Sequence, residues 1–333
     1  YTAAARSPKR GHPRQPEVRR LVLDTNLIIA ILQATVRSGT PILFACVGEI
    51  YAERSGNLNL GVEGMMLIGA IAGFFATFMT QSPVVGVIMA ALMGAAFSLI
   101  HAYVTITLRA DQIVSGLTLT LLGTGMSGFF GQSMVGQVAP GFEKLPIPGL
   151  SEIPWIGTIL FQQDALVYLS YILVPIAWWV LYRTHLGLSI RSVGESPDTA
   201  DSLGIRVSAL RYGCVMFGGA MAGIAGAYLS LAYTTMWIEQ MTAGRGWIAI
   251  ALVIFAGWSP MKAFLGAYLF GGADAMQLRF QAIGTPIPAH FLMMLPYLLT
   301  IGILILATRE SVRRRLGAPA ALAIPYAREE RSR

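Results

Sequence analysis

The sequence predicts an all-α, polytopic membrane protein of about ten transmembrane helices, and three observations carry this prediction. Of the 333 residues, 55% are hydrophobic and only 12% are charged, whereas a soluble globular domain has about 25% charged residues. The polar stretches are all short, so we expect no separate soluble domain. The 36 glycines suit transmembrane helices that pack closely through small residues.

The distribution of positive charge predicts how the helices are oriented. The net charge is +7, and basic residues gather in both flanks: Lys9, Arg10, Arg14, Arg19, Arg20, Arg309, Arg313, Arg314 and Arg315. Cytoplasmic flanks of membrane proteins carry an excess of Lys and Arg. We therefore expect residues 1–20 and 308–333 to be basic cytoplasmic tails of a multi-pass protein in the bacterial inner (plasma) membrane, with both termini in the cytoplasm and an even number of spans. Nucleic-acid binding is the less favoured explanation of the charge.

Residues 21–307 are expected to form the transmembrane domain. Its apolar segments are 21–36, 39–52, 58–80, 83–106, 113–135, 165–182, 212–233, 246–258, 263–283 and 289–307. Asp24, Asn26 and Gln33 interrupt the first segment, which could instead lie along the membrane interface. The Pro- and Gly-rich segment 136–164 is expected to be the longest extracytoplasmic loop.

The longest internal polar stretch, 183–211, contains four arginines and is expected to be a cytoplasmic loop. Within it, "SPDTADSLG" has the start and stop signals of a short helix. Ser196 suits the N-cap, Pro197 the first helical position and Asp198 the positive end of the helix dipole, while Gly204 suits a left-handed C-terminal cap. A helix of about two turns is not stable alone in water, so we expect it to dock on another surface rather than to be a plain solvated connection.

Two glycine-broken segments suggest an inverted repeat. "GNLNLGVEGMMLIGAIAG" from Gly56 and "GRGWIAIALVIFAG" from Gly244 both begin with glycines and polar residues and then run apolar to Ala-Gly. In the expected topology they start from opposite sides of the membrane. Transporters are often built from inverted repeats with broken helices at matching positions.

Several kinds of chemistry are absent from the sequence. No GxxxxGK[ST] phosphate loop is present, so the chain is not expected to bind ATP in this way. The cysteines and histidines show no metal-ligand spacing, and no set of catalytic residues converges, so an enzyme is disfavoured and no metal or other cofactor is expected in this chain. The carboxylates of Glu49, Glu63 and Asp274 lie inside spans and leave a secondary transporter open.

Four stretches together resemble a known family. They are "ERSGNLNLGVEGMMLIGA", "RSVGESPDTADSLGIRVSALRYGCVMFGGAMAGIAGAYLSL", "GRGWIAIALVIFAGWSPMKAFLGAYLFGGADAMQLRFQ" and "IPAHFLMMLPYLLTIGILIL". The chain is similar to the permease subunits of ATP-binding-cassette (ABC) importers, in the branched-chain amino acid and monosaccharide permease superfamily, and most of all to its nucleoside or simple-sugar branch. The resemblance runs from Pro41 to Ala307. Asn57, Trp258 and Met261 depart from the usual pattern and leave the substrate open.

The resemblance implies partners and a mechanism. A second permease, identical or different, would pair with this chain, and an ABC ATPase, in this branch often with two fused nucleotide-binding domains, would bind ATP and Mg. A substrate-binding protein would deliver nucleosides or simple sugars from outside, and alternating access would carry them across. The short cytoplasmic helix would be the helix that couples the permease to the ATPase, formed by Glu195, Ser196, Pro197, Asp198, Thr199, Ala200, Leu203 and Gly204. The alternative is a secondary transporter or channel for a small polar solute that acts without an ATPase.

Individual residues of the broken segments have two interpretations each. Glu63 either lines a translocation path or holds freed backbone N–H groups at the helix break. Asn57 and Asn59 either hydrogen-bond a substrate or satisfy the broken helix. Trp247 either stacks on a nucleobase or is an interfacial tryptophan.

Three further residue groups have structural explanations. Glu53 and Arg54 are expected to pair at the cytoplasmic face. Gly219 and Gly223 have the GxxxG spacing of close helix packing. Asp274 and Arg279 are five positions apart, which does not predict a helical ion pair.

Overall fold

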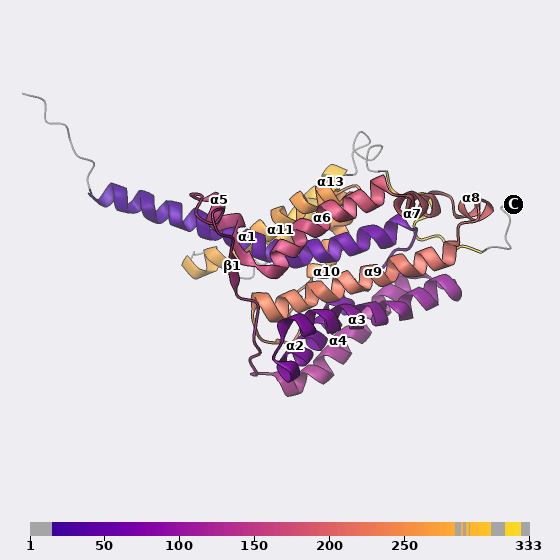
Figure 1. Cartoon of the computed structure of the whole chain (residues 1–333), viewed down its shortest axis with the longest axis horizontal. Helices are drawn as coiled ribbons and strands as arrows, with labels where there is room; N and C mark the ends of the chain where they lie inside the picture. The colour runs from indigo at the N-terminus through magenta and orange to yellow at the C-terminus, as the bar shows by residue number, and fades with distance from the viewer. Residues whose placement is uncertain (1–14, 284–287, 289–290, 293, 308–316, 328–333) are drawn as a thin grey trace, which may run out of the picture.

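The computed structural model describes residues 15–283, 288, 291–292, 294–307 and 317–327, and these are mostly helical (Figure 1). The α-helices are α1 Gln15–Arg54, α2 Val62–Thr80, α3 Pro83–Ala102, α4 Gln112–Gly131, α5 Ile156–Leu160, α6 Ala165–Arg183, α7 His185–Glu195, α8 Pro197–Ser202, α9 Val207–Tyr228, α10 Arg245–Phe255, α11 Pro260–Ile283 and α13 Leu295–Ala307. A 3₁₀ turn follows α4 at Gln132–Met134, and π-helical turns extend α3 at Tyr103–Thr107 and α9 at Leu229–Tyr233.

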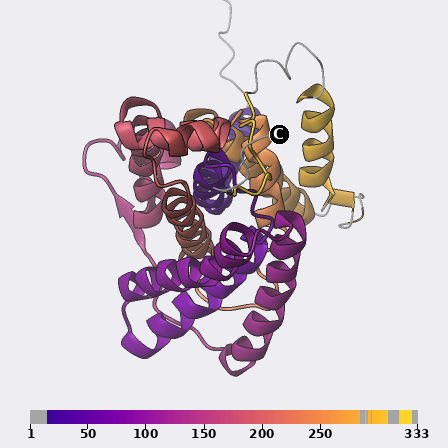
Figure 2. The ribbon, with the colours of Figure 1, turned by 90° about the vertical axis from the view of Figure 1, so that its right-hand side faces the viewer.

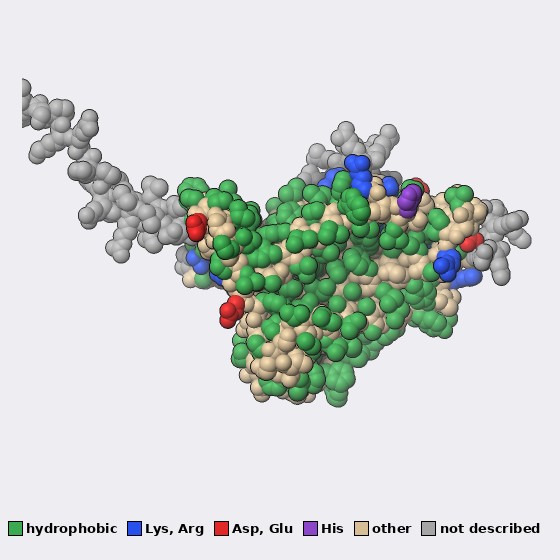
Figure 3. All heavy atoms as spheres, viewed as in Figure 1, with side chains coloured by type: hydrophobic (Ala, Val, Ile, Leu, Met, Phe, Trp, Pro, Cys, Tyr) green, Lys and Arg blue, Asp and Glu red, His purple; other side chains and the backbone are tan. Residues whose placement is uncertain are grey.

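Six of the described helices are long and apolar enough to cross a membrane: Leu27–Arg54, Val62–Thr80, Pro83–Thr107, Gln112–Met134, Ala165–Arg183 and Val207–Tyr233. They run along the long axis of the molecule (Figure 1). The middle of the face shown in Figure 3 is apolar, and charged side chains lie toward its ends. This arrangement is that of a multi-pass membrane protein, as predicted. The six helices among the described residues do not confirm the expected count of about ten spans.

The first two expected spans are wrong as separate helices, because both belong to α1. The helix has 40 residues, which at about 1.5 Å per residue is about twice the thickness of a bilayer core. Residues 37 and 38 lie between the two spans that the sequence predicts, but they and Gly39 find partners inside the bundle. Arg37 donates to the Ala232 carbonyl at 2.6 Å, Ser38 contacts the Tyr233 hydroxyl, and Gly39 packs against Ala267.

This merger changes the expected placement of the chain ends. Figure 1 shows that α1 starts at one end of the bundle, whereas α7, α8 and the end of α1 lie at the other. Residues 317–327 lie beside α7 and the loop after α1, because Ala321 donates to the Gly194 carbonyl and Ala323 to the Gly56 carbonyl. The two described ends of the chain are therefore at opposite ends of the molecule, rather than on one side. The expected N-terminal tail was residues 1–20. Residues 1–14 lie outside the described residues, and residues 15–20 belong to α1, which begins at Gln15.

The segment 136–164 has more structure than the plain loop that was expected. Strand β1 (Lys144–Pro146) pairs antiparallel with β2 (Gln162–Asp164), and α5 lies between them in sequence. Asp164 then caps α6, with its Oδ1 accepting from the Leu166 and Val167 N–H groups at 3.0 and 3.1 Å. The Asp cap and the following apolar run explain where α6 begins.

Helix α9 is central to the packing, because it contacts α1, α2 and α3. Glycines make these contacts close, as the GxxxG spacing predicts. A Cβ atom at Gly219 would collide with the backbone of Gly94, and one at Gly223 would collide with the Ala90 carbonyl. On α2, Gly69 packs directly against Gly223. Figure 2, which views the bundle from the α8 end, shows the α2–α4 group on one side and α13 on another.

We expect Gly223→Ala to lower the thermal midpoint of the purified protein, whereas Gly213→Ala on the same helix should not. The added methyl at 223 meets backbone atoms of α3, and such overpacking costs about 1–3 kcal/mol. A Cβ at Gly213 meets nothing within 4 Å, and alanine favours helix over glycine. Differential scanning fluorimetry in detergent measures both, and equal midpoints for the two variants would contradict the close packing at Gly223.

Candidate functional site

The break between α1 and α2 is a buried, internally hydrogen-bonded loop. The Asn59 N–H donates to Glu49 Oε1 at 3.0 Å, one turn inside the end of α1. The Asn59 side-chain oxygen accepts from the Gly61 N–H at 2.9 Å, which closes an Asx-type turn directly before α2. The Asn57 amide donates to the Thr105 hydroxyl at 3.3 Å. Both asparagines are fully buried, so each hydrogen-bonds the broken segment and its neighbours.

Neighbouring helices satisfy the backbone of this loop. The Leu58 N–H donates to Gln112 Oε1 at 2.7 Å, and His101 Nε2 lies 3.1 Å from the Leu58 carbonyl oxygen. His101 Nδ1 in turn lies 3.0 Å from the Ser115 hydroxyl. Irregular backbone at membrane depth needs such partners, because lipid offers none. Gln112 and His101 were not singled out from the sequence, since single polar residues in apolar segments carry no pattern.

Glu63 joins the two glycine-broken segments. Its Oε1 accepts from the Thr242 hydroxyl at 2.6 Å and from the Gly244 N–H at 2.8 Å. Its Oε2 accepts from the Gly246 N–H at 2.6 Å. The carboxylate therefore holds freed backbone N–H groups, as one interpretation of the sequence proposed, but these belong to α10 rather than to its own helix α2. A carboxylate at this position also faces the positive end of the α10 dipole.

The starts of α2 and α10 thus meet at one point inside the bundle. Glycine is required there for space, because a Cβ at Gly246 would meet the backbone and carboxylate of Glu63. Glycine is also required for conformation, because Gly244 has φ = +80°, a region that residues with a Cβ atom rarely adopt. The two segments that the sequence paired as an inverted repeat are therefore in direct contact, while the repeat itself stays a prediction.

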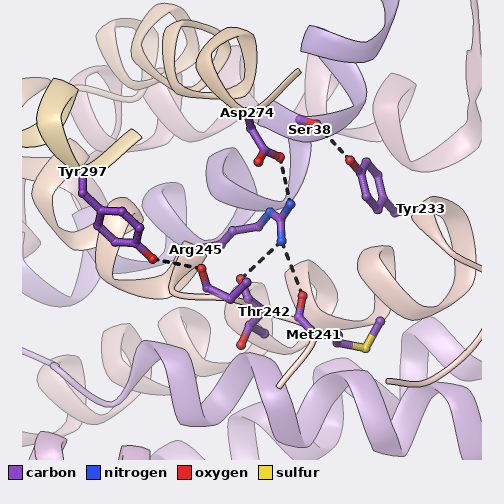
Figure 4. Close-up of polar contacts among 8 residues, drawn as sticks. Ser38, Tyr233, Met241, Thr242, Arg245, Asp274 and Tyr297 are labelled. Carbon is purple, nitrogen blue, oxygen red and sulfur yellow. Dashed lines mark hydrogen bonds and ion pairs between the residues drawn. The ribbon is translucent and has the colours of Figure 1, made fainter. Parts of the chain in front are cut away.

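Arg245, between these two glycines, forms a second polar cluster at the α10 start (Figure 4). Its guanidinium pairs with Asp274 Oδ2 at 2.8 Å and donates to the carbonyls of Met241 and Thr242 at 3.4 and 3.3 Å. It also lies over the Tyr233 ring, 5.7 Å from its centroid. In the sequence, Arg279 was the basic residue that we compared with Asp274 as a possible ion-pair partner on the same helix. The true partner comes from another helix, which spacing cannot reveal.

Trp247 lies beside this junction and is 37% exposed. It follows Gly246, whose N–H binds Glu63, so the structure brings Trp247, Glu63 and Asn59 to the same end of α2 and α10. Of the four predicted path residues, Trp247 is exposed, whereas Asn57, Asn59 and Glu63 are buried.

Glu53 and Arg54 do not form the ion pair that was expected. Glu53 Oε2 accepts from the Trp258 indole N–H at 2.5 Å. Arg54 donates to the carbonyls of Trp258 and Gly257 at 3.4 and 3.3 Å. Both residues contact Trp258 and hold the turn after α10 against the end of α1. Trp258, which departs from the family pattern, is thus the unexpected partner.

The predicted short helix is present at the opposite end of the molecule as α8. Ser196 is its N-cap residue, Pro197 its first residue, and Gly204 has φ = +84°. Ala200 is 1% exposed and packs with Val193 and Val207, whereas Leu203 is 76% exposed. Glu195, Asp198 and Thr199 are exposed as well. The helix therefore rests on α7 and α9 through one face and presents the other outward.

Residues 31–304 match the family described as the branched-chain amino acid transport system permease component. The chain belongs to this family. Its members are transport subunits rather than enzymes, and the match includes both broken segments, α8 and the Arg245–Asp274 pair.

Three relatives are similar over nearly their whole length. TsgC13 of Haloferax volcanii, provisionally assigned as a glucose ABC transporter permease, is 43% identical over 90% of this chain and 98% of its own. The nucleoside ABC transporter permease NupC of Lactococcus lactis is 37% identical over 82% and 90%. The guanosine ABC transporter permease NupQ of Bacillus subtilis is 34% identical over 92% and 98%. The resemblance that the sequence motifs indicated is confirmed.

We expect Glu63→Gln to destabilise the protein. Both carboxylate oxygens accept from N–H or O–H donors, and a glutamine would place its NH₂ group against one of them. Hydrogen bonds to charged groups contribute about 1.5–3 kcal/mol each, so the thermal midpoint should fall by several degrees. Glu195→Gln, at an exposed acid, is the matched control and should leave the midpoint unchanged. If the Glu63→Gln protein were as stable as the control, the negative charge of Glu63 would not be needed to stabilise the N–H groups at the start of α10.

Proposed function

We propose that this chain is the permease subunit of an ATP-driven importer and forms the translocation path for nucleosides or related simple sugars. The observation that carries the proposal is the family match over residues 31–304, with relatives at 34–43% identity that are named for glucose, nucleosides and guanosine. Import would proceed by alternating access, with the energy supplied by a partner ATPase that binds ATP and Mg. A binding protein on the outer side would deliver the substrate.

In this proposal α8 couples the permease to the ATPase. Its exposed face combines the large apolar side chain of Leu203 with the polar Asp198 and Thr199, a composition suited to a pocket on a partner protein. Its buried face, through Ala200, transmits movement to α7 and α9. The residues that the motif assigns to this helix therefore have two roles. Ala200 anchors the helix, and Leu203 with its exposed neighbours contacts the partner.

The broken-helix junction is proposed as the fixed point beside the path. Glu63, Asn57 and Asn59 would hold the starts of α2 and α10 in place, and Trp247 would present its accessible ring to the substrate. Aromatic rings are suited to stack on nucleobases or pack on sugar faces. In such an assembly the exposed apolar faces of α3 and α4 would meet lipid or a second permease, identical or different.

We also propose the orientation of the chain in a bacterial inner membrane. The end that carries α7, α8 and residues 317–327 would face the cytoplasm, where an ATPase and its ATP are found. The segment with β1, β2 and α5 would then face outward and lie close to the binding protein. The start of α1 falls on that outer side.

Uptake of labelled guanosine, adenosine and ribose by the reconstituted complex tests the main proposal. Uptake should require both ATP and the binding protein, and it should stop when the ATPase is omitted. Uptake by this chain alone, without an ATPase, would instead support the secondary-transporter alternative.

We expect Leu203→Glu to weaken assembly with the ATPase and to reduce substrate-stimulated ATP hydrolysis at least tenfold. The substitution places a charge where an apolar side chain would be buried in the partner, and it leaves the fold of the permease intact because Leu203 is exposed. Co-purification of the ATPase from detergent measures assembly. Leu150→Glu, an exposed leucine in the segment at the other end, is the control and should co-purify normally. Normal assembly and hydrolysis in Leu203→Glu would remove α8 from the coupling role.

A further inference from the structure

A small pocket lies between α1, α10, α11 and α13, at the start of α10. Its cavity has a volume of about 120 Å³, and its lining includes Arg245, Asp274, Gln277, Tyr297 and Phe270. Pockets that enclose drug-sized ligands measure about 300–1,000 Å³. This one therefore admits a single small ring or its substituents, and not a whole nucleoside.

Three of the lining residues form one row on α11. Phe270, Asp274 and Gln277 follow each other at spacings of four and three, so they share a face of the helix. Tyr297 on α13 closes the opposite wall and is 46% exposed, and its hydroxyl donates to the Ala243 carbonyl at 3.1 Å (Figure 4). The pocket is thus polar along one row, aromatic at two points and open at the side of Tyr297.

Gln277 is a polar side chain of the lining that the surrounding helices leave available to a ligand. It is 8% exposed and lines the pocket, and within the described ranges no side-chain hydrogen bond is made to its amide. Polar residues inside membrane domains usually serve function. An amide offers two donor hydrogens and an acceptor oxygen, which is the combination that a hydroxyl group satisfies.

The charges of the pocket favour a neutral ligand. Arg245 and Asp274 pair with each other at 2.8 Å and are 13% and 19% exposed, so the positive and negative charges balance. Asp274 uses Oδ2 in this pair, which leaves Oδ1 available as an acceptor beside Gln277. An anion such as phosphate would meet the Asp274 carboxylate, whereas a hydroxyl can donate to it.

We propose that this pocket binds the sugar ring of the substrate, with Gln277 and Asp274 hydrogen-bonding neighbouring hydroxyl groups and Phe270 and Tyr297 packing on the apolar face of the ring. The inference rests on the proposed function, since it assigns a substrate subsite within that permease. It also links the subsite to the broken helices. The residues on either side of Arg245 bind Glu63, so the short segment 244–246 holds the α2 junction on one side and the sugar pocket on the other.

Protection of an engineered cysteine tests the subsite directly. Ala243 lines the pocket and is exposed, while the two natural cysteines, Cys46 and Cys214, are buried. In the assembled complex in lipid nanodiscs, ribose or guanosine should slow maleimide labelling of Ala243→Cys, and inorganic phosphate should not. Adding Gln277→Leu should raise the ribose concentration for half-maximal protection by up to about tenfold, the effect of one lost hydrogen bond. Gln137→Leu, at an exposed glutamine, is the control and should leave this concentration unchanged.

Stability separates a binding role of Gln277 from a structural one. Leucine removes an amide to which no described residue hydrogen-bonds, so Gln277→Leu should keep the thermal midpoint while protection weakens. Three results would overturn the proposal that this pocket binds sugar. They are a lower midpoint of Gln277→Leu with unchanged protection, protection by phosphate but not by ribose, and no protection at all. ATP-dependent uptake by the unmodified complex is measured in parallel: uptake without protection refutes only this pocket, whereas absence of uptake refutes the proposed function.

Discussion

The hydrogen bonds from the α10 start to the Glu63 carboxylate are the interaction on which the rest of the membrane domain depends. Two helices begin inside the bundle, and each beginning leaves backbone N–H groups without helical partners. Water would satisfy them at a surface, but none is offered by lipid. One carboxylate accepts from Gly244, Gly246 and Thr242, and its charge is balanced by the dipole of α10. Breaking two helices at the same place therefore lets an acid at the start of α2 satisfy the start of α10.

The glycines follow from this same requirement for close approach. The junction brings backbone to backbone at Gly246, and the α2–α9–α3 contacts do so again at Gly69 and Gly223. Without a hydrophobic driving force between helices in lipid, such contacts supply much of the association. The polar groups are accordingly confined to a few balanced sites, of which the Arg245–Asp274 pair is one. A rigid, tightly packed frame around a small polar region is what a path for a polar solute needs.

Local signals in the sequence predicted local structure well. The caps at Ser196 and Gly204 predicted α8, and the spacing of Gly219 and Gly223 predicted close packing. Local signals did not predict contacts between distant segments. Asp274 pairs with Arg245 rather than with a residue on its own helix, and Glu63 binds the start of another helix. The same limit explains the error at residues 37 and 38, whose polarity suggested a break between two spans. Their partners at Ala232 and Tyr233 come from a segment almost 200 positions away, which local sequence does not reveal. The family was identified because several long motifs occur in order.

The segment at residues 317–327 has a consequence for the order in which the protein is completed. Its Ala323 N–H binds the carbonyl of Gly56, and Arg211 joins the Ser55 and Ile324 carbonyls at 3.1 and 3.3 Å. The loop after α1 thus depends on partners from a segment far along the chain. During synthesis α1 leaves the ribosome long before residues 317–327, so this loop gains these hydrogen bonds only after that later segment has been made.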